Sequence, residues 1–425
     1  MKKILLLGAG GRECALAWKL SQSPFCGSLY IAPGNPGTAA YGTNVAVGYN
    51  DFEGIKKACI EYEIDILLPG PEEPLVNGIY DFIKSDPALA HIIICGPTKE
   101  GAQLEGSKAF SKRFMERHDI PTAAYKEFTA NNYDEGVAYI AGTQPPIVLK
   151  ADGLAAGKGV VIAQSVAEAT DAFKAMIKDE QFGAASSKVV IEQFLDGIEL
   201  SVFALSDGDN YILLPEAKDY KRIGEGDKGL NTGGMGAISP VPFADAAFMQ
   251  KVEERIVGPT VDGLKEENID YQGFIFFGLI KVNGEPYVIE YNCRMGDPET
   301  EVVMPRLEND LVELIIKMGE GKLGEMTAMH SAWAAGAVML VSGGYPGDYE
   351  RGKVMTGFDE AEGSWLFHAG TTRKGEDIVT SGGRVLAVTS MAPTLGEALQ
   401  QSYANAERIA YAGKYYRKDI GWEFL

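Results

Sequence analysis

The sequence predicts a protein of several domains, with α/β architecture at the N-terminus and α+β architecture further along. At 425 residues the chain exceeds what one hydrophobic core usually organises, so roughly two to four packed units are expected. About the first hundred residues alternate short apolar runs with helical stretches, which is typical of a parallel, doubly wound sheet. The last segment, 331–425, consists mostly of short strands and indicates a separate closing domain.

The composition is that of an ordinary globular protein, with 46% hydrophobic and 23% charged residues. No apolar run approaches the roughly 20 residues that a membrane helix needs. The net charge of -20 repels phosphodiester backbones, and no block of lysine and arginine offsets it. Five scattered cysteines without a paired metal-ligand pattern indicate reduced thiols. We therefore expect a monomeric cytoplasmic protein that binds small molecules and neither a membrane nor a nucleic acid.

The N-terminal sheet is expected to bind ligands at the carboxyl ends of its strands. Its four expected strands lie at 3–7, 28–32, 65–68 and 92–95. The turn 8–13 follows the first strand and opens a helix, a geometry in which backbone amides hold a phosphate. The dinucleotide fingerprint is not met, because its third glycine falls at Glu13 and no acid follows the second strand. The turn favours a phosphate on a small substrate, with a ligand-free tight turn as the simpler alternative.

A smaller unit is expected at about 121–194. Its expected elements are three strands and one helix, at 147–150, 160–163, 188–192 and 166–178. The loop 151–159 combines glycines with lysines, so bare amides and ammonium groups can close over polyphosphate charge. It is no P-loop, because Gly153 and Gly157 are one residue too close and Gly159 replaces the required Ser or Thr. A flexible hairpin tip with solvated lysines is the alternative.

The segment after this unit mixes strands, helices and one long loop. Strands are expected at 199–205 and 211–214, helices at 244–266, 310–318 and 395–411, and a polar loop at 216–236. Loops of that length are usually functional or disordered. Glu192 and Glu199 flank a turn at Leu195, where backbone groups can meet an adenine edge and a carboxylate can reach ribose hydroxyls. Solvated surface glutamates are the plain alternative.

A β-hairpin near residue 283 carries the sharpest local argument. Two apolar strands, 273–282 and 286–291, are joined by Asn-Gly, the strongest short hairpin signal. Because side chains alternate along a strand, Glu290 and Asn292 share one face. Two adjacent hard oxygen ligands suit Mg²⁺ with its bound phosphates. A structural hydrogen bond from Arg294 to Glu290 is the alternative.

Seven motifs in one order connect these pieces. They are LLLGAGGRE at 5–13, APGNPGT at 32–38, LPGPEEPLVNG at 68–78, QLEGSKAF at 103–110, KADGLAAGKGV at 150–160, NTGGMGAISP at 231–240 and IEYNCRMGDPET at 289–300. On these motifs the chain resembles the ATP-grasp superfamily and, within it, the glycinamide ribonucleotide synthetases, nearly end to end. The resemblance implies a Rossmann-like pre-ATP-grasp N-terminal domain (1–102), an ATP-grasp body (103–325) with the lid at about 121–194, and a strand-rich C-terminal domain (326–425).

The resemblance also implies a reaction, the ATP-dependent ligation of glycine to 5-phosphoribosylamine in purine biosynthesis. A carboxylate is a poor electrophile, so ATP would first convert glycine to glycyl phosphate, which the amine then attacks. The products would be glycinamide ribonucleotide, ADP and phosphate, with positioning and charge neutralisation as the means of catalysis. Two rivals are another ATP-grasp ligase or carboxylase, such as one that activates bicarbonate, and a non-catalytic nucleotide-binding regulator.

Roles for single residues follow from the resemblance, motif by motif. ATP contacts are implied for Lys108, Lys150, Gly153, Gly157, Lys158, Gly159, Glu192, Leu195 and Glu199. Mg²⁺ or Mn²⁺ would be held by Glu290 and Asn292. Catalytic roles are implied for Lys150, Asp219 and Arg294. Contacts to glycine and phosphoribosylamine are implied for Gly10, Gly11, Arg12, Glu72, Lys221, Asn231, Gly233, Gly234 and Asp297.

Three departures from the family's pattern are visible. Cys14 stands where the family's GRE motif is usually followed by histidine. Gln193 and Ile198 replace acids that are often found around the adenosine segment. The strand 273–282 offers no acid to face Glu290, unlike many ATP-grasp enzymes. The number of metal ions is therefore open.

Overall fold

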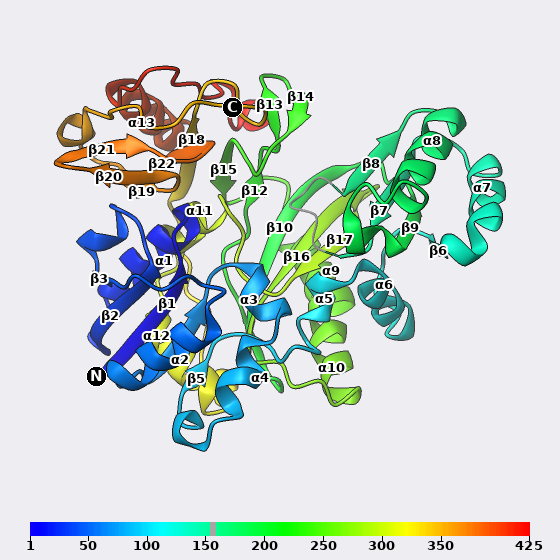
Figure 1. Cartoon of the computed structure of the whole chain (residues 1–425). Helices are drawn as coiled ribbons and strands as arrows, with labels where there is room; N and C mark the ends of the chain where they lie inside the picture. The colour runs from blue at the N-terminus through cyan, green and yellow to red at the C-terminus, as the bar shows by residue number, and fades with distance from the viewer. Residues whose placement is uncertain (154–158) are drawn as a thin grey trace.

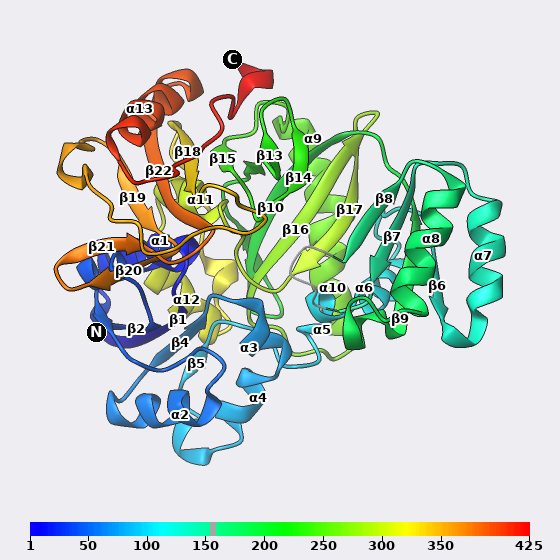
Figure 2. The same cartoon turned by 45° about the horizontal axis from the view of Figure 1, so that its top comes forward.

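The computed structural model of the chain describes residues 1–153 and 159–425 (Figure 1). The N-terminal and C-terminal sheets lie on one side of a central antiparallel sheet, and a small lid lies on the other (Figures 1 and 2). Within these described ranges, no helix combines the length and the apolar character that crossing a bilayer would require.

The N-terminal sheet is parallel, as predicted, with the strand order β3-β2-β1-β4-β5. It has one strand more than the four expected, because β3 is only two residues long. Its strands are β1 (Lys2–Gly8), β2 (Cys26–Pro33), β3 (Thr43–Asn44), β4 (Ile66–Pro69) and β5 (Ile93–Ile94). Its helices are α1 (Gly11–Ser21), α2 (Phe52–Glu61), α3 (Glu72–Val76) and α4 (Ile79–Lys84). The apolar run of β1 is buried on both faces, which explains why it is continuous instead of alternating. The β1–α1 turn and the start of α3 thus lie at the carboxyl edge of the sheet.

The central sheet is antiparallel, with the order β11-β10-β16-β17. Its strands are β10 (Ile198–Ser206), β11 (Tyr211–Leu213), β16 (Gly273–Val282) and β17 (Glu285–Asn292). Asn283 and Gly284 both have positive φ, +50° and +84°, so the predicted two-residue hairpin is confirmed. The helix predicted at 244–266 is continuous but consists of α9 (Ala246–Val252), a π-helical turn (Glu253–Val257) and α10 (Gly258–Glu266).

The lid is a four-stranded antiparallel sheet with the order β6-β9-β7-β8. Its strands are β6 (Tyr125–Thr129), β7 (Ile147–Ala151), β8 (Val160–Ala163) and β9 (Lys188–Gln193), and its helices are α7 (Tyr133–Ala141) and α8 (Val166–Ile177). Phe128, Phe173 and Ile191 belong to a hydrophobic cluster confined to this unit. Before it come α5 (Gln103–Gly106) and α6 (Lys108–Arg117). A core of its own allows the lid to keep its shape as a unit.

The C-terminal sheet joins two distant parts of the chain in the order β12-β15-β18-β22-β19. Its strands are β12 (Lys218–Asp219), β15 (Gly236–Ser239), β18 (Ala334–Val341), β19 (Trp365–His368) and β22 (Arg384–Ala392). Two small hairpins and three helices accompany it, namely β13 (Arg222–Gly224) with β14 (Lys228–Asn231), β20 (Thr371–Lys374) with β21 (Asp377–Thr380), α11 (Thr300–Arg306), α12 (Leu311–Gly319) and α13 (Leu395–Arg408).

The prediction of one polar loop at 216–236 was wrong, because β12, β13 and β14 lie within it. These strands are short and polar, so they show no apolar alternation. β12 gains its pairing from β15, which in turn pairs with β18 about a hundred residues later. A local pattern does not contain such partners.

The start of β16 approaches the end of β5 closely enough to require glycine. Gly273 has φ +150°, and a Cβ at this position would lie 2.8 Å from the Gly96 backbone. We expect Gly273→Ala to lower the free energy of unfolding by roughly 1–3 kcal/mol, because both the backbone conformation and the contact would be strained. Urea denaturation measures this change, with Gly48→Ala as the control, since a Cβ at Gly48 meets no atom within 4 Å. Equal stability of the two variants would contradict the expectation.

Candidate active site

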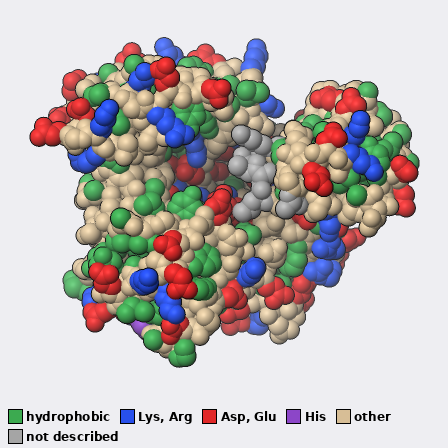
Figure 3. Space-filling model, in the orientation of Figure 1, with side chains coloured by type: hydrophobic (Ala, Val, Ile, Leu, Met, Phe, Trp, Pro, Cys, Tyr) green, Lys and Arg blue, Asp and Glu red, His purple; other side chains and the backbone are tan. Residues whose placement is uncertain are grey.

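The candidate site lies in a hollow bounded by the N-terminal part, the C-terminal part and the lid (Figure 3). Acidic and basic side chains gather inside this hollow. The residues singled out from the sequence come from strands of the lid, the central sheet and the C-terminal part, from the first residues of α1, α3 and α6, and from loops. The structure therefore brings together groups that are up to about 280 positions apart in the chain, as in the hydrogen bond from Arg12 to Met295.

Two lysines line the side of the hollow next to the lid. Lys150 on β7 places its Nζ 3.0 Å from Glu192 Oε2 and donates to the Ile289 carbonyl at 3.1 Å. Lys108 at the start of α6 donates to the Gly153 carbonyl at 2.9 Å. Burial lowers the pKa of Lys108, while the nearby charge of Glu290 opposes this shift. Both ammonium groups thus lie beside β17, where a polyphosphate would need them.

Glu192 is a buried counter-ion, and the alternative of a solvated surface glutamate is wrong for it. Its Oε2 lies 3.0 Å from Lys150 Nζ and 3.3 Å from Lys112 Nζ, whereas its Oε1 has no hydrogen-bond partner in the described part of the chain. Burial lowers the pKa of Lys112 to about 8. Lys112 was not among the predicted site residues, because a lysine inside a helix carries no sequence signal.

The remaining nucleotide-side candidates are distributed around this pair. Leu195 lies half-buried in the turn between β9 and β10, and Glu199 lies at the exposed start of β10, whose other residues from 200 on are buried. Gly153 has φ +116°, and the Ala151 amide donates to the Gly159 carbonyl at 2.8 Å. Gly157 and Lys158, which were also predicted to contact ATP, lie outside the described residues.

Glu290 and Asn292 lie at the end of β17 on the face that looks into the hollow. Glu290 is opposite Gly278, so the expected lack of an acid on the facing strand is confirmed. Asn292 Oδ1 accepts a hydrogen bond from Arg294 Nη2 at 3.0 Å, and its buried Nδ2 has no partner among the described residues. The alternative of a hydrogen bond from Arg294 to Glu290 is therefore not realised. Nowhere in residues 1–153 and 159–425 do three or more acidic, His or Cys side chains form a metal-binding group.

Glu105 holds the guanidinium group of Arg294 in place. Its Nη2 donates to Glu105 Oε1 at 2.8 Å, and its Nε lies 3.4 Å from Glu72 Oε2. Glu105 Oε2 accepts hydrogen bonds from the Cys293 amide at 2.9 Å and from its thiol at 3.1 Å. Burial raises the pKa of Glu105, an effect that Arg294 opposes. Glu105 lies within the QLEGSKAF motif, yet only the fold reveals that it orients Arg294.

Three charged residues, Lys221, Glu199 and Asp219, form a second cluster near Glu290. Lys221 Nζ lies 2.7 Å from Glu199 Oε2. Burial opposes the charge on Lys221, but Glu199, Asp219 and Glu290 together raise its pKa well above the usual value. Burial raises the pKa of Asp219, and Lys221 counteracts that shift. This cluster places an ammonium group and two carboxyl groups where a small zwitterion can be held.

In the β1–α1 turn, the Gly10 amide is hydrogen-bonded within the turn itself. The Gly10 amide donates to Glu13 Oε2 at 2.7 Å, and Arg12 Nε donates to Glu13 Oε1 at 2.6 Å. Arg12 Nη1 also donates to the Met295 carbonyl at 3.3 Å. Glu13, where the dinucleotide fingerprint fails, therefore takes the hydrogen bond expected for a phosphate at Gly10. The turn instead presents Gly11 and Arg12 to the loop that follows β17.

The C-terminal sheet contributes a guanidinium that the sequence did not single out. Arg384 Nη1 donates to the Gly233 carbonyl at 2.7 Å and to the Asp297 carbonyl at 2.9 Å, and it lies 2.9 Å from Asp297 Oδ1. Tyr345 accepts a hydrogen bond from the Gly233 amide at 2.9 Å. A Cβ at Gly234, where φ is +120°, would collide with Pro298, so this loop needs glycine. Asn231 is exposed and pairs with Arg222 across the β13–β14 hairpin.

The remaining departures from the motifs lie away from these contacts. Cys14 is buried in the core between α1 and the C-terminal sheet, and burial raises the pKa of its thiol to about 12. Gln193 and Ile198 are exposed at the ends of β9 and β10. Cys14 thus serves packing.

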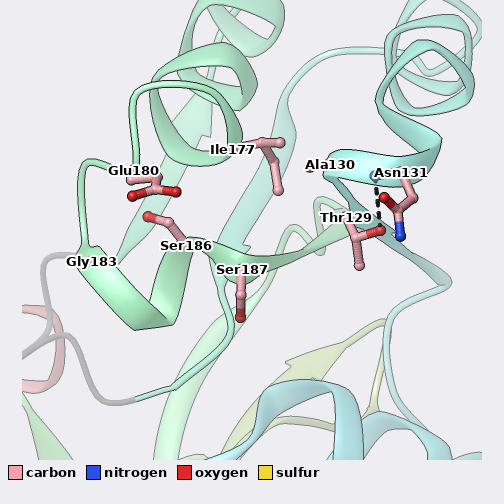
Figure 4. A pocket seen from close by; sticks show the side chains of 8 residues that line it. All are labelled: Thr129, Ala130, Asn131, Ile177, Glu180, Gly183, Ser186 and Ser187. Atoms are coloured by element: carbon pink, nitrogen blue, oxygen red, sulfur yellow. Dashed lines mark hydrogen bonds between the residues drawn. The ribbon is translucent and has the colours of Figure 1, made fainter.

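A separate cavity of about 500 Å³ lies inside the lid (Figure 4). Its lining consists of small polar and apolar side chains and one acid, namely Thr129, Ala130, Asn131, Ile177, Glu180, Gly183, Ser186 and Ser187. No lysine or arginine occurs among these described lining residues, so the cavity lacks the charge that a nucleotide phosphate requires. The site therefore belongs to the hollow between the domains.

Comparison with known sequences covers nearly the whole chain. The phosphoribosylglycinamide synthetase N domain matches residues 2–105, its ATP-grasp (A) domain matches residues 106–300, and its C domain matches residues 335–423. A phosphoribosylamine–glycine ligase from Vibrio cholerae is 45% identical over 428 residues, covering 100% of this chain and 98% of that protein. One from Escherichia coli O157:H7 is 46% identical over 429 residues, covering 100% and 99%.

Comparison with solved structures agrees. The crystal structure of phosphoribosylamine–glycine ligase from Thermotoga maritima superposes with a TM-score of 0.86 at 34% identity, covering 98% of this chain and 99% of that chain. A biotin carboxylase from Campylobacter jejuni reaches 0.74 at 15% identity, covering 97% and 92%, which shows a shared fold alone. With three domain matches in order and relatives near half identity over full length, the chain belongs to the phosphoribosylglycinamide synthetase family, whose central domain is an ATP-grasp domain.

Proposed function

We propose that this protein ligates glycine to 5-phosphoribosylamine with ATP, giving glycinamide ribonucleotide, ADP and phosphate in purine biosynthesis. The observation that carries the proposal is the β17 end, where Glu290 and Asn292 lie between two groups of charged residues. The lysines Lys108 and Lys150 lie on the lid side, and Lys221 lies on the other. ATP phosphates fit the first group, and a small carboxylate substrate fits the second.

Glu290 and Asn292 fit a divalent cation, either Mg²⁺ or Mn²⁺. Their oxygens are hard donors of the kind these ions prefer. Asn292 Nδ2, which has no partner within 1–153 and 159–425, can donate to a phosphate oxygen. A bound cation would neutralise charge on the transferred phosphoryl group. Lys108 and Lys150 add positive charge next to it, so the γ-phosphoryl group can approach the anionic glycine carboxylate.

The cluster around Lys221 would hold glycine through both halves of the reaction. Glycine is a zwitterion, so its carboxylate suits Lys221 and Arg294, whereas its ammonium suits Asp219. Arg12, Glu72, Asp297 and the 231–234 loop remain our candidates for phosphoribosylamine. Its amine attacks the carbonyl carbon of glycyl phosphate, the new C–N bond forms, and the C–O bond to phosphate breaks as the nitrogen loses a proton.

The broader assignments rest on family membership. We propose that the chain divides at 1–102, 103–325 and 326–425, with the lid at about 121–194, and acts as a monomer in the cytoplasm. The ATP-binding role of the 151–159 loop belongs to the same proposal. The separate sheets support this division, and β12 and β15 of the central segment belong to the C-terminal sheet.

A substrate-dependence assay tests the proposal against its rivals. ADP release that requires glycine and phosphoribosylamine together supports it. ADP release with bicarbonate alone would instead identify a carboxylating enzyme, and ATP binding without turnover under every mixture would indicate a regulator.

Removing the Glu290 carboxylate, a proposed metal ligand, is expected to reduce turnover far more than it weakens ATP binding. We expect Glu290→Ala to lower kcat by about 10²-fold or more, because the charge on the transferred phosphoryl group would be poorly neutralised. Glu285→Ala, at the exposed start of the same strand, removes only surface ion pairs and serves as the control. Steady-state rates and equilibrium ATP binding measure the two effects, and near wild-type kcat in Glu290→Ala would refute the metal role.

Glu299 is expected to make stability depend on pH. Its Oε1 accepts a hydrogen bond from Ser201 Oγ at 2.9 Å, and burial followed by the charge of Asp219 raises its pKa to about 7. A raised pKa in the folded state means that its contribution to stability is complete below its unfolded pKa and is lost as pH rises through about 7.

We therefore expect wild-type stability to fall relative to Glu299→Gln between about pH 5 and about pH 8, because the amide stays neutral. Denaturation midpoints across this range measure the difference. As the control, Glu308→Gln changes an exposed position and keeps Glu299, so its stability should follow the wild-type pH profile. Parallel pH profiles for wild type and Glu299→Gln would exclude the titration.

A further inference from the structure

The C-terminal segment 415–423 packs along β12 and the β13–β14 hairpin. The Tyr415 hydroxyl donates to the Ile223 carbonyl at 2.9 Å. The Gly226 amide donates to Asp419 Oδ2 at 2.7 Å. The segment thus contacts a hairpin that follows the Lys221 cluster directly in the chain.

Arg417 is the centre of this contact and is completely buried. Its Nε and Nη2 donate to the two carboxylate oxygens of Asp419 at 2.7 and 2.8 Å. Its Nη1 donates to Asp227 Oδ1 at 2.7 Å and to the Arg222 carbonyl at 3.2 Å. Asp419 therefore fixes the guanidinium plane, and the remaining nitrogen holds both sides of the hairpin turn, a division of donors that lysine lacks.

Glu423 holds the strand immediately before the hairpin. Its Oε1 lies 3.2 Å from Lys218 Nζ, and its Oε2 accepts a hydrogen bond from the Tyr220 hydroxyl at 2.9 Å. The Lys218 ammonium also lies 4.4 Å from the centre of the Tyr220 ring. One carboxylate thus ties down two residues that are two positions apart.

The alternation of side chains along 218–221 connects the contacts of Glu423 to the Lys221 cluster. The chain is extended here, with the Tyr220 amide donating to Gly236 and the Met235 amide donating to Tyr220. Side chains on extended backbone point alternately to opposite faces, so Lys218 and Tyr220 face the C-terminal segment while Asp219 and Lys221 face the hollow. Fixing the first pair therefore fixes the second.

We propose that Arg417 and Glu423 are positioning residues for the ligation, which set where Asp219 and Lys221 lie relative to Glu290. Arg417 acts through the hairpin after Lys221, and Glu423 acts through Lys218 and Tyr220. The inference rests on the proposed function of this face. Displacement of a charged group by about 1 Å can cost about 10²-fold in rate, so anchors outside the hollow matter to the chemistry.

The test compares full-length variants in the two-substrate assay. Glu423→Ala removes both anchors of the strand, Arg417→Lys keeps the charge without the planar fork, and Arg417→Met removes both. Arg408→Met is the matched control, because the side chain of Arg408 also donates hydrogen bonds within the C-terminal part, to the Glu360 carbonyl and to Asn405 Oδ1. The measurements are kcat, KM for glycine, ATP affinity, and hydrogen exchange of the 216–224 backbone.

We expect Glu423→Ala to lower kcat by about tenfold or more and to raise KM for glycine, with ATP affinity within about twofold of wild type. Exchange of 216–224 should accelerate, Arg417→Lys should retain more activity than Arg417→Met, and Arg408→Met should match wild type. Wild-type kcat and glycine KM in Glu423→Ala, or unchanged exchange of 216–224, would overturn the inference alone. A wild-type enzyme without glycine-dependent turnover would overturn the proposed function and, with it, the role assigned here.

Discussion

The ammonium group of Lys150 is the contact on which the arrangement of the site depends. It belongs to the lid, yet it bonds the Ile289 carbonyl of the central sheet and lies against Glu192, which Lys112 of α6 also approaches. Removing one partner from a buried ion pair typically costs about 3–5 kcal/mol, because the other charge is left uncompensated. The lid, α6 and the β17 end are thus held in one geometry before any nucleotide binds.

Charge compensation also explains how a strongly acidic chain can receive anions. Three cations of the hollow each have an acidic partner: Lys221 pairs with Glu199, Arg294 with Glu105 and Arg384 with Asp297. Such pairs hold each cation at a fixed place but leave little unbalanced positive potential. A cation brought in with ATP would supply the charge that the protein withholds, which accords with two hard oxygen donors at Glu290 and Asn292.

The sequence predicted the parts of the site that are local. The Asn-Gly hairpin and the placement of Glu290 and Asn292 on one face of a strand follow from patterns a few residues long. The structure contains both features. The contacts of Glu105, Arg384 and Arg417 were not predicted, because their partners Arg294, Gly233 and Asp227 lie 189, 151 and 190 positions away. An arginine or a glutamate looks the same in a sequence whether the fold exposes it to solvent or buries it in an ion pair. The polar strands at 218–231 were not predicted for a different reason: they are short and polar, so no apolar alternation marks them, although β13 and β14 pair with each other.

The glycine opposite Glu290 restricts how this site can change during evolution. A Cβ at Gly278 would lie 3.1 Å from Glu290 Cγ, so even alanine would press on that carboxylate. An acid at this position would need Glu290 to move away from the place where it is useful. On this backbone a pair of facing acids would therefore require the Glu290 side chain to shift, whereas a ligand from another element would leave it in place.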